Sequence, residues 1–384
     1  MNSEIKAAEN SGKESEVKIK KRSPIAAAFF TLLVPGLGHF YCGEIKRGFI
    51  FYLLVTGIIT VFDALIKFFP GYIITIIAVF TFIPLGLYVL LESIITALKK
   101  YQYKLQFFNK PKYYIAIVIT SVYFVGPFQE IFMPHGFTTP TGSMQNTVSP
   151  GDYFFTNNLV YGIKNPFTGN FLIIYNRPQN RDIVNFDFND MPGYSEKEKE
   201  KDVSYFKRIL AVPGDSFVIK NREVYLNGEL YKNFWNFNFG GIGKISPEFT
   251  DRSIFPDGYK WNVDNYGPIK VPKAGDEVSF DTSSINMWKR IIRDEGNKLE
   301  IIKDRIFIND IEKYSYTFKD NYYFMIGDNW YNSLDSRYFG FVNENDVVSK
   351  LTMIYFSWDR DIPIKDIGRK LRSIRWDRIG KMIE

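Results

Sequence analysis

Two side chains in the second half of the chain, Ser143 and Lys207, have the types and settings needed for nucleophilic chemistry. Ser143 lies in the small-residue turn TTPTGSMQNTV (138–148), and a serine hydroxyl needs a base before it can attack at neutral pH. Lys207 lies inside the apolar stretch VSYFKRILAVPGD (203–215). Because burial disfavours the charged ammonium, a lysine in such surroundings can accept the serine proton directly. The pair predicts a serine nucleophile activated by a neutral lysine.

Histidine is the alternative base, but the chain has only two histidines, His39 and His135. His135 precedes Ser143 by eight residues, and no aspartate stands beside it in the sequence to orient the ring. The scarcity of histidine also disfavours a zinc site, and FGGIGK (239–244) lacks the Ser or Thr that a phosphate-binding loop needs after Gly-Lys. We therefore expect Lys207 to be the base, with no metal and no cofactor.

A dense polar cluster lies between two apolar runs in MIGDNWYNSLDSRYFGFV (325–342). Buried polar groups are costly unless they satisfy one another. Asp335 paired with Arg337 or with Arg208 would form a rigid scaffold. Ser333 is placed to hydrogen-bond the neutral lysine amine and orient it.

The first third of the chain contains four apolar segments, at 24–41, 48–69, 72–98 and 113–131. The last three reach the length of about 20 residues that crosses a bilayer, whereas the first is interrupted by Pro35 and Gly36. The basic tail 1–22 and the basic loop 99–112 should both stay in the cytoplasm. We expect three full crossings and a broken or re-entrant first segment. Four full crossings, with the tail outside, is the alternative.

From residue 134 onward the pattern changes to strand-length runs separated by turn residues, which predicts a mostly antiparallel β domain. Asn227-Gly228 is a strong hairpin signal. The charged segment 189–201 is expected to be a solvated loop. Cys42 is the single cysteine, so no disulfide can form within the chain.

Four motifs resemble, in order, those of bacterial type I signal peptidases, the membrane-anchored serine proteases that remove signal peptides from exported proteins. They are PTGSMQNTV (140–148), GDYFFTNNLVYG (151–162), YFKRILAVPGD (205–215) and GDNWYNSLDSRYFG (327–340). The resemblance covers roughly 113–360. It implies a membrane-anchored fold, with N-terminal α-helical transmembrane segments followed by a mostly antiparallel β catalytic domain that carries a β cap insertion.

The resemblance also implies roles for particular residues. Ser143 would be the nucleophile and Lys207 the general base, and the Ser143 backbone N–H and the Thr141 hydroxyl would form the oxyanion hole. Ser333 would orient the lysine, Asp335, Arg337 and Arg208 would brace the site, and Met144 would pack near the substrate groove. The family usually has Arg where this chain has Trp330, which puts only a peripheral contact in doubt.

These expectations define six regions. They are a cytoplasmic tail (1–22), a transmembrane module (23–98), a basic cytoplasmic loop (99–112), a transmembrane anchor (113–133), an extracytoplasmic catalytic domain (134–360, with the cap at about 216–326) and a basic tail (361–384). The expected location is the bacterial cytoplasmic (inner) membrane, and the expected partners are preprotein signal peptides and the lipid bilayer.

Other functions are open as alternatives. The net charge of +6 is spread among charges of both signs, which disfavours a nucleic-acid partner. A catalytically silent, membrane-tethered domain that binds exported chains is one alternative. The other is a small membrane transporter or scaffold built on 24–98, with the β domain as an accessory.

Overall fold

The computed structural model describes residues 20–68, 72–100, 103–122, 135–139, 141–165, 171–187, 204–231 and 237–383. The chain divides into two compact units, Met1–Met133 and Pro134–Glu384. The boundary lies where the apolar segments give way to strand-length runs in the sequence. Most of the basic tail 1–22 and the whole charged segment 189–201 lie outside the described residues.

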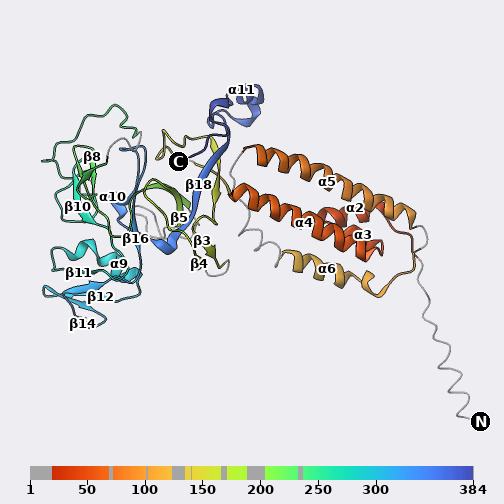
Figure 1. The fold of residues 1–384 in the computed structure, drawn as a ribbon, viewed down its shortest axis with the longest axis horizontal. Helices are drawn as coiled ribbons and strands as arrows, with labels where there is room; N and C mark the ends of the chain where they lie inside the picture. Colours follow the sequence, from red (N-terminus) through yellow and green to blue (C-terminus); the bar gives the residue numbers. More distant parts are fainter. Residues whose placement is uncertain are drawn as a thin grey trace, which may run out of the picture. The chain divides into compact units, whose positions relative to one another are not determined.

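The first unit is helical (Figure 1). Its described helices are α2 (Pro24–Leu33), α3 (Leu37–Tyr41), α4 (Ile45–Phe68), α5 (Tyr72–Lys99), the 3-10 turn η1 (Phe107–Asn109) and α6 (Pro111–Thr120). Within α4 and α5, the windows Ile45–Phe62 and Ile76–Lys99 are long and apolar enough to cross a membrane, judged by length and composition. The rest of the fourth apolar segment, beyond residue 122, is outside the described residues up to 134.

The first apolar segment is broken, as its glycine and proline predict. Helix α2 ends at Leu33, and α3 begins after Gly36, whose φ of 85° is a left-handed conformation that favours glycine. A Cβ at Gly36 would lie 2.0 Å from the carbonyl oxygen of Gly48, so only glycine allows this approach to α4. The break is confirmed, whereas the re-entrant path stays a prediction.

Polar side chains inside the helical unit pair with one another. His39 is fully buried and contacts the carboxylate of Glu92, which also lies 3.5 Å from Arg47 Nη1 and accepts a hydrogen bond from Thr96 at 3.2 Å. Such mutual pairing is what polar groups among apolar helices require. The side chain of Asp63, the other acidic interruption, is outside the described part of the unit.

The second unit is built on a seven-stranded sheet in which every neighbouring pair is antiparallel. The strands, in spatial order, are β1 (His135–Thr138), β2 (Asp152–Asn157), β18 (Val347–Ser357), β5 (Ile183–Asp187), β6 (Ser204–Ala211), β16 (Tyr322–Ile326) and β17 (Val342–Asn343). The predicted antiparallel β fold is therefore confirmed.

Smaller sheets and short helices complete this unit (Figure 1). A four-stranded sheet has the order β10 (Tyr266–Lys270), β7 (Ser216–Lys220), β8 (Glu223–Leu226) and β9 (Glu229–Leu230). A three-stranded sheet has the order β12 (Leu299–Ile302), β13 (Arg305–Ile308) and β14 (Ile311–Glu312). Two further sheets have two strands each: β11 (Glu277–Ser279) with β15 (Ser315–Thr317), and β3 (Gly162–Lys164) with β4 (Phe171–Ile174). The short helices are η3 (Ile285–Met287), α9 (Lys289–Asp294), α10 (Ser336–Phe339), η4 (Glu344–Asp346), η5 (Ile364–Asp366), α11 (Ile367–Arg372) and η6 (Trp376–Arg378).

Strands β7 to β15 lie between the motifs YFKRILAVPGD (205–215) and GDNWYNSLDSRYFG (327–340), in the part of the chain that is expected to form a cap; the cap itself stays a prediction. Asn227 and Gly228 both have positive φ and connect β8 to β9, so the predicted hairpin turn is confirmed. Strand β16 (Tyr322–Ile326) falls within the expected cap segment of about 216–326, but it pairs with β6 in the main sheet. Near the C-terminus, Met382 forms a β-bridge with Met353 of β18, so the end of the C-terminal basic tail (361–384) packs on the main sheet.

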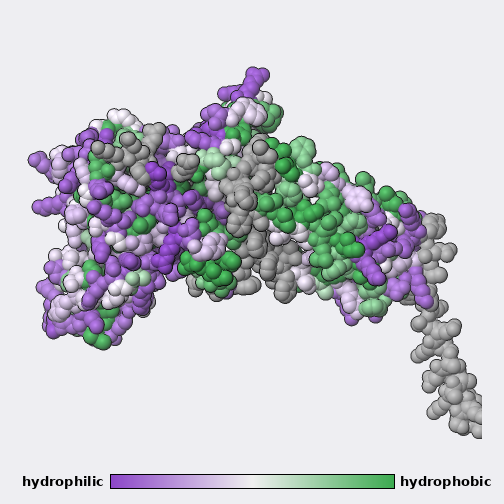
Figure 2. Space-filling view, viewed as in Figure 1, coloured by the Kyte–Doolittle hydropathy of each residue, from purple (hydrophilic) through white to green (hydrophobic). Residues whose placement is uncertain are grey.

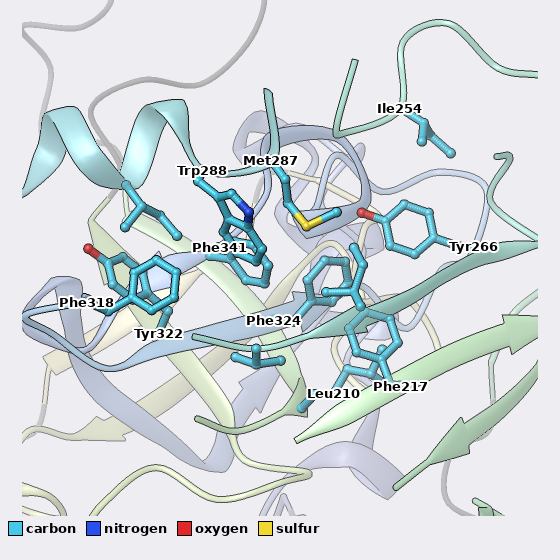
Figure 3. Packing of buried hydrophobic residues seen from close by; sticks show 14 of the residues in the cluster. Leu210, Phe217, Ile254, Tyr266, Met287, Trp288, Phe318, Tyr322, Phe324 and Phe341 are labelled. Atoms are coloured by element: carbon cyan, nitrogen blue, oxygen red, sulfur yellow. The ribbon is translucent and has the colours of Figure 1, made fainter. Parts of the chain in front are cut away.

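One hydrophobic core joins the cap to the main sheet (Figure 3). Leu210 of β6, Phe217 of β7 and Phe324 of β16 are all buried in it, and the rings of Phe217 and Phe324 are 4.5 Å apart. Because β6 carries Lys207 on the same strand as Leu210, this core also fixes the strand that positions the lysine.

Candidate active site

Ser143 lies in a compact turn whose next residues are anchored in a core. The N–H of Val148 donates to the carbonyl of Met144 at 2.9 Å, and both side chains are buried in a cluster with Phe154 and Ile354. This packing holds the turn from one side. Met144 is 2% exposed, and its predicted contact with a substrate stays a prediction.

Asn329, in the motif GDNWYNSLDSRYFG (327–340), holds the same turn. The sequence reasoning did not single out this residue. The backbone N–H of Asn329 donates to the carbonyl of Ser143 at 3.0 Å, and its side-chain amide donates to the carbonyl of Gly142 at 2.9 Å. Two hydrogen bonds to consecutive carbonyls define the path of the turn. The only sequence signal for this role was the position of Asn329 within the Gly-Asp-Asn turn.

Lys207 meets Ser143 as the sequence predicts. Strand β6 is paired with β5, with Lys207 opposite Val184, and the Nζ of Lys207 lies 3.1 Å from the Oγ of Ser143. The amine also donates to the carbonyl of Phe206 at 3.1 Å, and the side chain is buried. Burial lowers the pKa of Lys207 from 10.5 to about 8, although the carboxylates of Asp335 and Asp328 raise it in part. The neutral form of this lysine is therefore far more populated near pH 7 than that of an unperturbed lysine, although the ammonium remains the major form.

Ser333 is placed close to the pair but does not form the hydrogen bond that we expected. Its Oγ is buried and has no hydrogen-bond partner among the residues that the structure describes, while the lysine amine is engaged by Ser143 and by the Phe206 carbonyl. A Cβ at Gly327 would lie 2.1 Å from the Ser333 Oγ and 2.6 Å from the Ser143 carbonyl oxygen. Because Gly327 has no side chain, Ser333 can approach the turn that contains Ser143.

Asp335 and Arg337 form the predicted scaffold. Arg337 donates to both carboxylate oxygens of Asp335, at 2.9 Å from Nε and 2.8 Å from Nη2, and both residues are fully buried. Asp335 also accepts the backbone N–H of Gly327 at 3.0 Å. A bidentate pair with further hydrogen bonds is strongly oriented, so it fixes the loop that carries Ser333.

Trp330 has a more central place than the peripheral contact that we expected. It is fully buried, its indole N–H donates to Asp264 of the cap at 2.8 Å, and the guanidinium of Arg337 lies 4.7 Å from its ring centre. Trp330 thus links the scaffold to the cap by a cation–π contact and a hydrogen bond. Sequence reasoning missed this link because the partner, Asp264, stands far away in the chain.

Arg208 has a different partner from the one considered first. It donates to Asp328, at 2.8 Å from Nε to Oδ1 and 2.7 Å from Nη2 to Oδ2, and Thr147 hydrogen-bonds the same carboxylate. Asp335 is paired with Arg337 instead. Asp328 was not predicted, although it lies in the Gly-Asp-Asn turn. Asp328 connects the turn that contains Ser143, the strand β6 that contains Lys207 and its own motif at 327–340.

The pair opens into a pocket of about 410 Å³. Its lining residues are Thr141, Ser143, Tyr205, Lys207, Tyr331, Asn332, Ser333, Leu334 and Tyr338. The Thr141 Oγ1 lies 3.3 Å from the Ser143 Oγ, so its hydroxyl borders the position that a reacting carbonyl would take. The backbone of His135 lies in β1, and its side chain is outside the described residues.

Comparison with known proteins identifies the family. The sequence profile of the signal peptidase family, peptidase S26, matches residues 112–239 and 310–358. Signal peptidase I of Buchnera aphidicola subsp. Schizaphis graminum is 30% identical over 271 residues, which are 67% of this chain and 78% of that protein. Signal peptidase I of Pseudomonas aeruginosa is 26% identical over 259 residues, which are 65% of this chain and 70% of that protein.

A crystal structure of a signal peptidase I from Enterococcus faecalis also matches, with 46% of this chain and 97% of that chain covered. Its identity to this chain is 18% and its TM-score is 0.24.

An antiparallel β fold with a serine and a buried lysine facing one pocket has the features of a serine peptidase. The chain belongs to the signal peptidase I family of peptidases. The predicted class, a serine endopeptidase of this family, is thereby confirmed.

Proposed function

We propose that this chain cleaves N-terminal signal peptides from exported preproteins, with Ser143 as the nucleophile and Lys207 as the general base. The observation that carries the proposal is the distance of 3.1 Å between the lysine Nζ and the serine Oγ in a pocket where burial lowers the pKa of Lys207 to about 8. A base must be within hydrogen-bond reach of the proton that it removes and must be deprotonated at the working pH. Lys207 meets the first condition, and its lowered pKa makes the second attainable as the pH approaches 8.

The reaction follows from this geometry. As the Ser143 Oγ attacks the scissile carbonyl carbon, its proton passes to the neutral amine of Lys207. Negative charge develops on the carbonyl oxygen, and the Thr141 hydroxyl and the Ser143 N–H are the proposed donors to it. The lysine ammonium then protonates the leaving amine, which releases the mature protein and leaves the signal peptide as an ester on Ser143. Lys207 next deprotonates a water that hydrolyses this ester and restores the serine.

The surrounding scaffold supports the roles proposed for Ser143 and Lys207 because it fixes three separate segments of the chain relative to one another. The Arg208–Asp328 pair holds the lysine strand to the turn after β16, and Asn329 holds that turn to the nucleophile turn. Ser333 is proposed to accept a hydrogen bond from Lys207 once the amine is protonated, since its buried Oγ has no other partner in the structure. Preorganised groups of this kind need no rearrangement during the reaction.

The proposed location is the bacterial cytoplasmic membrane, with a multi-pass helical unit and the catalytic unit on the extracytoplasmic side. Support comes from the two long apolar helices α4 and α5, and from the basic residues of 99–112, which favour the cytoplasmic side. Signal peptides present their cleavage site just beyond an apolar segment. A peptidase tethered to the membrane would meet that site near the bilayer surface.

The test uses the purified full chain, in detergent or proteoliposomes, and a model preprotein. Ser143→Ala and Lys207→Ala should each abolish cleavage, while both variants unfold at the temperature of the parent or above it. His135→Ala should keep most of the activity. An inactive His135→Ala together with an active Lys207→Ala would overturn the serine–lysine mechanism. A parent chain that binds preprotein without cleaving it would favour the silent binding domain.

A further inference from the structure

An apolar pocket of about 410 Å³ lies within the helical unit. One wall comes from the segment 34–52, which contains α3 and the first turns of α4, and the other comes from 107–121, which contains η1 and α6 (Figure 1). Seven of the lining residues are aromatic, and none of the lining residues that the structure describes is charged. The reaction proposed for Ser143 and Lys207 does not use this pocket, so its content needs an explanation of its own.

Contacts within the chain hold both walls of the pocket in place. On one side, a Cβ at Gly48 would lie 2.4 Å from the ring of Phe40, so glycine at this position lets α3 approach α4. On the other side, Asn109 accepts a hydrogen bond from the Tyr103 hydroxyl at 3.0 Å and donates one to the Tyr114 hydroxyl at 2.8 Å. These bonds fix η1 to the start of α6. The pocket is therefore preformed, as ligand pockets usually are.

The pocket runs along the axes of α4 and α6, beginning where both helices begin. Ile45, Phe49 and Tyr52 line it from one face of α4, and residues from Tyr113 to Ser121 line it along α6. At a rise of 1.5 Å per residue, these two stretches are about 11 and 12 Å long. The hydrocarbon core of a bilayer is about 30 Å thick, so one leaflet supplies about 15 Å. The pocket therefore has roughly the depth of one leaflet.

Exposed lysines lie where the pocket begins. The Nζ of Lys112 is 5.2 Å from the ring centre of Tyr113, which lines the pocket. Lys110 is the N-cap of α6, and Lys46 is the second residue of α4. The loop 99–112 contains five lysines and no acidic residue. Figure 2 shows hydrophobic surface over the helical unit and hydrophilic surface at the end where Figure 1 draws the start of α6. Such a site matches a ligand with an apolar chain and an anionic head.

Size and charge favour a lipid over the apolar segment of a signal peptide. A helix of ten residues is about 15 Å long and about 10 Å wide, which is roughly 1,200 Å³ and about three times the volume of the pocket. Basic residues precede the apolar segment of a signal peptide, so they would meet lysines of the same sign. An acyl chain is far narrower than a helix, and the phosphate of an anionic phospholipid carries the charge that attracts lysine.

We propose that the helical unit binds one anionic phospholipid of the cytoplasmic leaflet, with an acyl chain in this pocket and the phosphate at Lys46, Lys110 and Lys112. The proposal rests on the membrane location given under the proposed function. The match to the family profile begins at residue 112, so the wall formed by α3 and α4 lies outside the matched residues. The lipid fills the space between α4 and α6 and thereby stabilises the packing of α6 in the helical unit.

The first experiment measures selectivity for the headgroup. The full chain in a neutral detergent is titrated with phosphatidylglycerol or with phosphatidylcholine of the same acyl chains, and native mass spectrometry counts the bound lipid. We expect phosphatidylglycerol to bind at least tenfold more tightly. Lys110→Gln/Lys112→Gln should abolish this preference. Lys303→Gln/Lys313→Gln, which removes the same charge from exposed positions of the catalytic unit, should retain it. Equal binding of the two lipids by the parent would overturn the proposal.

The second experiment fills the pocket. Ala116→Phe adds a ring at a position of α6 that lines the pocket, whereas Ile119→Phe adds one at an exposed position of α6 that does not line it. Circular dichroism should give both variants the helical content of the parent. Ala116→Phe should weaken the binding of phosphatidylglycerol at least tenfold, and Ile119→Phe should bind like the parent. Unchanged binding in Ala116→Phe would show that the acyl chain lies elsewhere and would overturn the proposal.

A cleavage assay with a short soluble peptide separates this inference from the proposed function. Ala116→Phe and Lys110→Gln/Lys112→Gln should cleave the peptide at the parent rate. A parent chain that cleaves the peptide but does not prefer phosphatidylglycerol would overturn only the lipid proposal. A parent chain that binds phosphatidylglycerol but cleaves no substrate would count against the serine–lysine mechanism. Displacement of the lipid by a synthetic signal peptide, one molecule for one, would assign the pocket to the substrate and overturn the lipid proposal.

Discussion

Arg208 and Asp328 form a buried bidentate ion pair that joins the strand carrying Lys207 to the turn at 327–329, which is hydrogen-bonded to the Ser143 segment. Their side chains are 6% and 2% exposed. Such a pair is costly to form, since both charges lose water, but it is highly directional. The pair fixes the relative position of two segments that are 120 residues apart in the chain.

Removing one charge of this pair should destabilise the catalytic unit. Asp328→Asn leaves the Arg208 guanidinium buried without a full counter-charge, and we expect the free energy of unfolding to fall by roughly 3 kcal/mol. Asp310→Asn is the matched control, because the Lys298–Asp310 pair is exposed and should contribute little. Chemical denaturation of the two variants measures the difference. Equal stability of both variants would show that the buried pair does not hold the unit together.

Activity should rise with pH across the titration of Lys207. The folded-state pKa is lowered by burial to about 8, so the lysine is protonated and inactive below this value and neutral above it. A profile of kcat/KM against pH on a soluble peptide should therefore climb with a midpoint near 8. A midpoint near the ordinary lysine value of about 10.4 would mean that water reaches the amine and that it is not the base.

Ser333 and Ser336 should separate catalysis from folding. In the described part of the chain the Ser333 Oγ has no partner, so Ser333→Ala leaves no group unsatisfied and should not lower the unfolding temperature. Turnover should fall by roughly 100-fold if the hydroxyl orients Lys207. Ser336 accepts the N–H of Met325 at 2.9 Å and is fully buried. Ser336→Ala should therefore cost about 1–3 kcal/mol of stability. Normal turnover in Ser333→Ala would remove Ser333 from the site.

Thr141 is tested by keeping or removing its hydroxyl. Thr141→Ser retains the donor and should stay within about tenfold of the parent, whereas Thr141→Val keeps the shape and should lower kcat on the order of 100- to 1000-fold with little change in KM. Steady-state kinetics on a peptide substrate distinguish the two variants. A Thr141→Val chain with near-normal kcat would show that Thr141 only shapes the turn.

The sequence by itself determined the features that depend on local chemistry. The glycine and proline at 35–36 predicted the break between α2 and α3, the Asn227-Gly228 pair predicted the hairpin, and the runs after 134 predicted antiparallel strands. The types of Ser143 and Lys207 predicted a reacting pair, because burial of a lysine among apolar neighbours lowers its pKa. The two side chains do meet, 3.1 Å apart, and their catalytic roles stay predictions. Each of these signals lies within a few neighbouring residues and acts through the backbone conformation or the burial of those residues.

The tertiary structure decided which distant groups meet. Adjacent residues of a strand such as Lys207 and Arg208 face opposite ways, but the register between β6 and β16 selected Asp328 as the partner of Arg208. The same folding buried Trp330 against Asp264 and left the Ser333 hydroxyl without a partner among the described residues. Pairing across a sheet depends on distances of a few ångströms between segments that are far apart in the chain, and a linear pattern of residue types does not contain those distances.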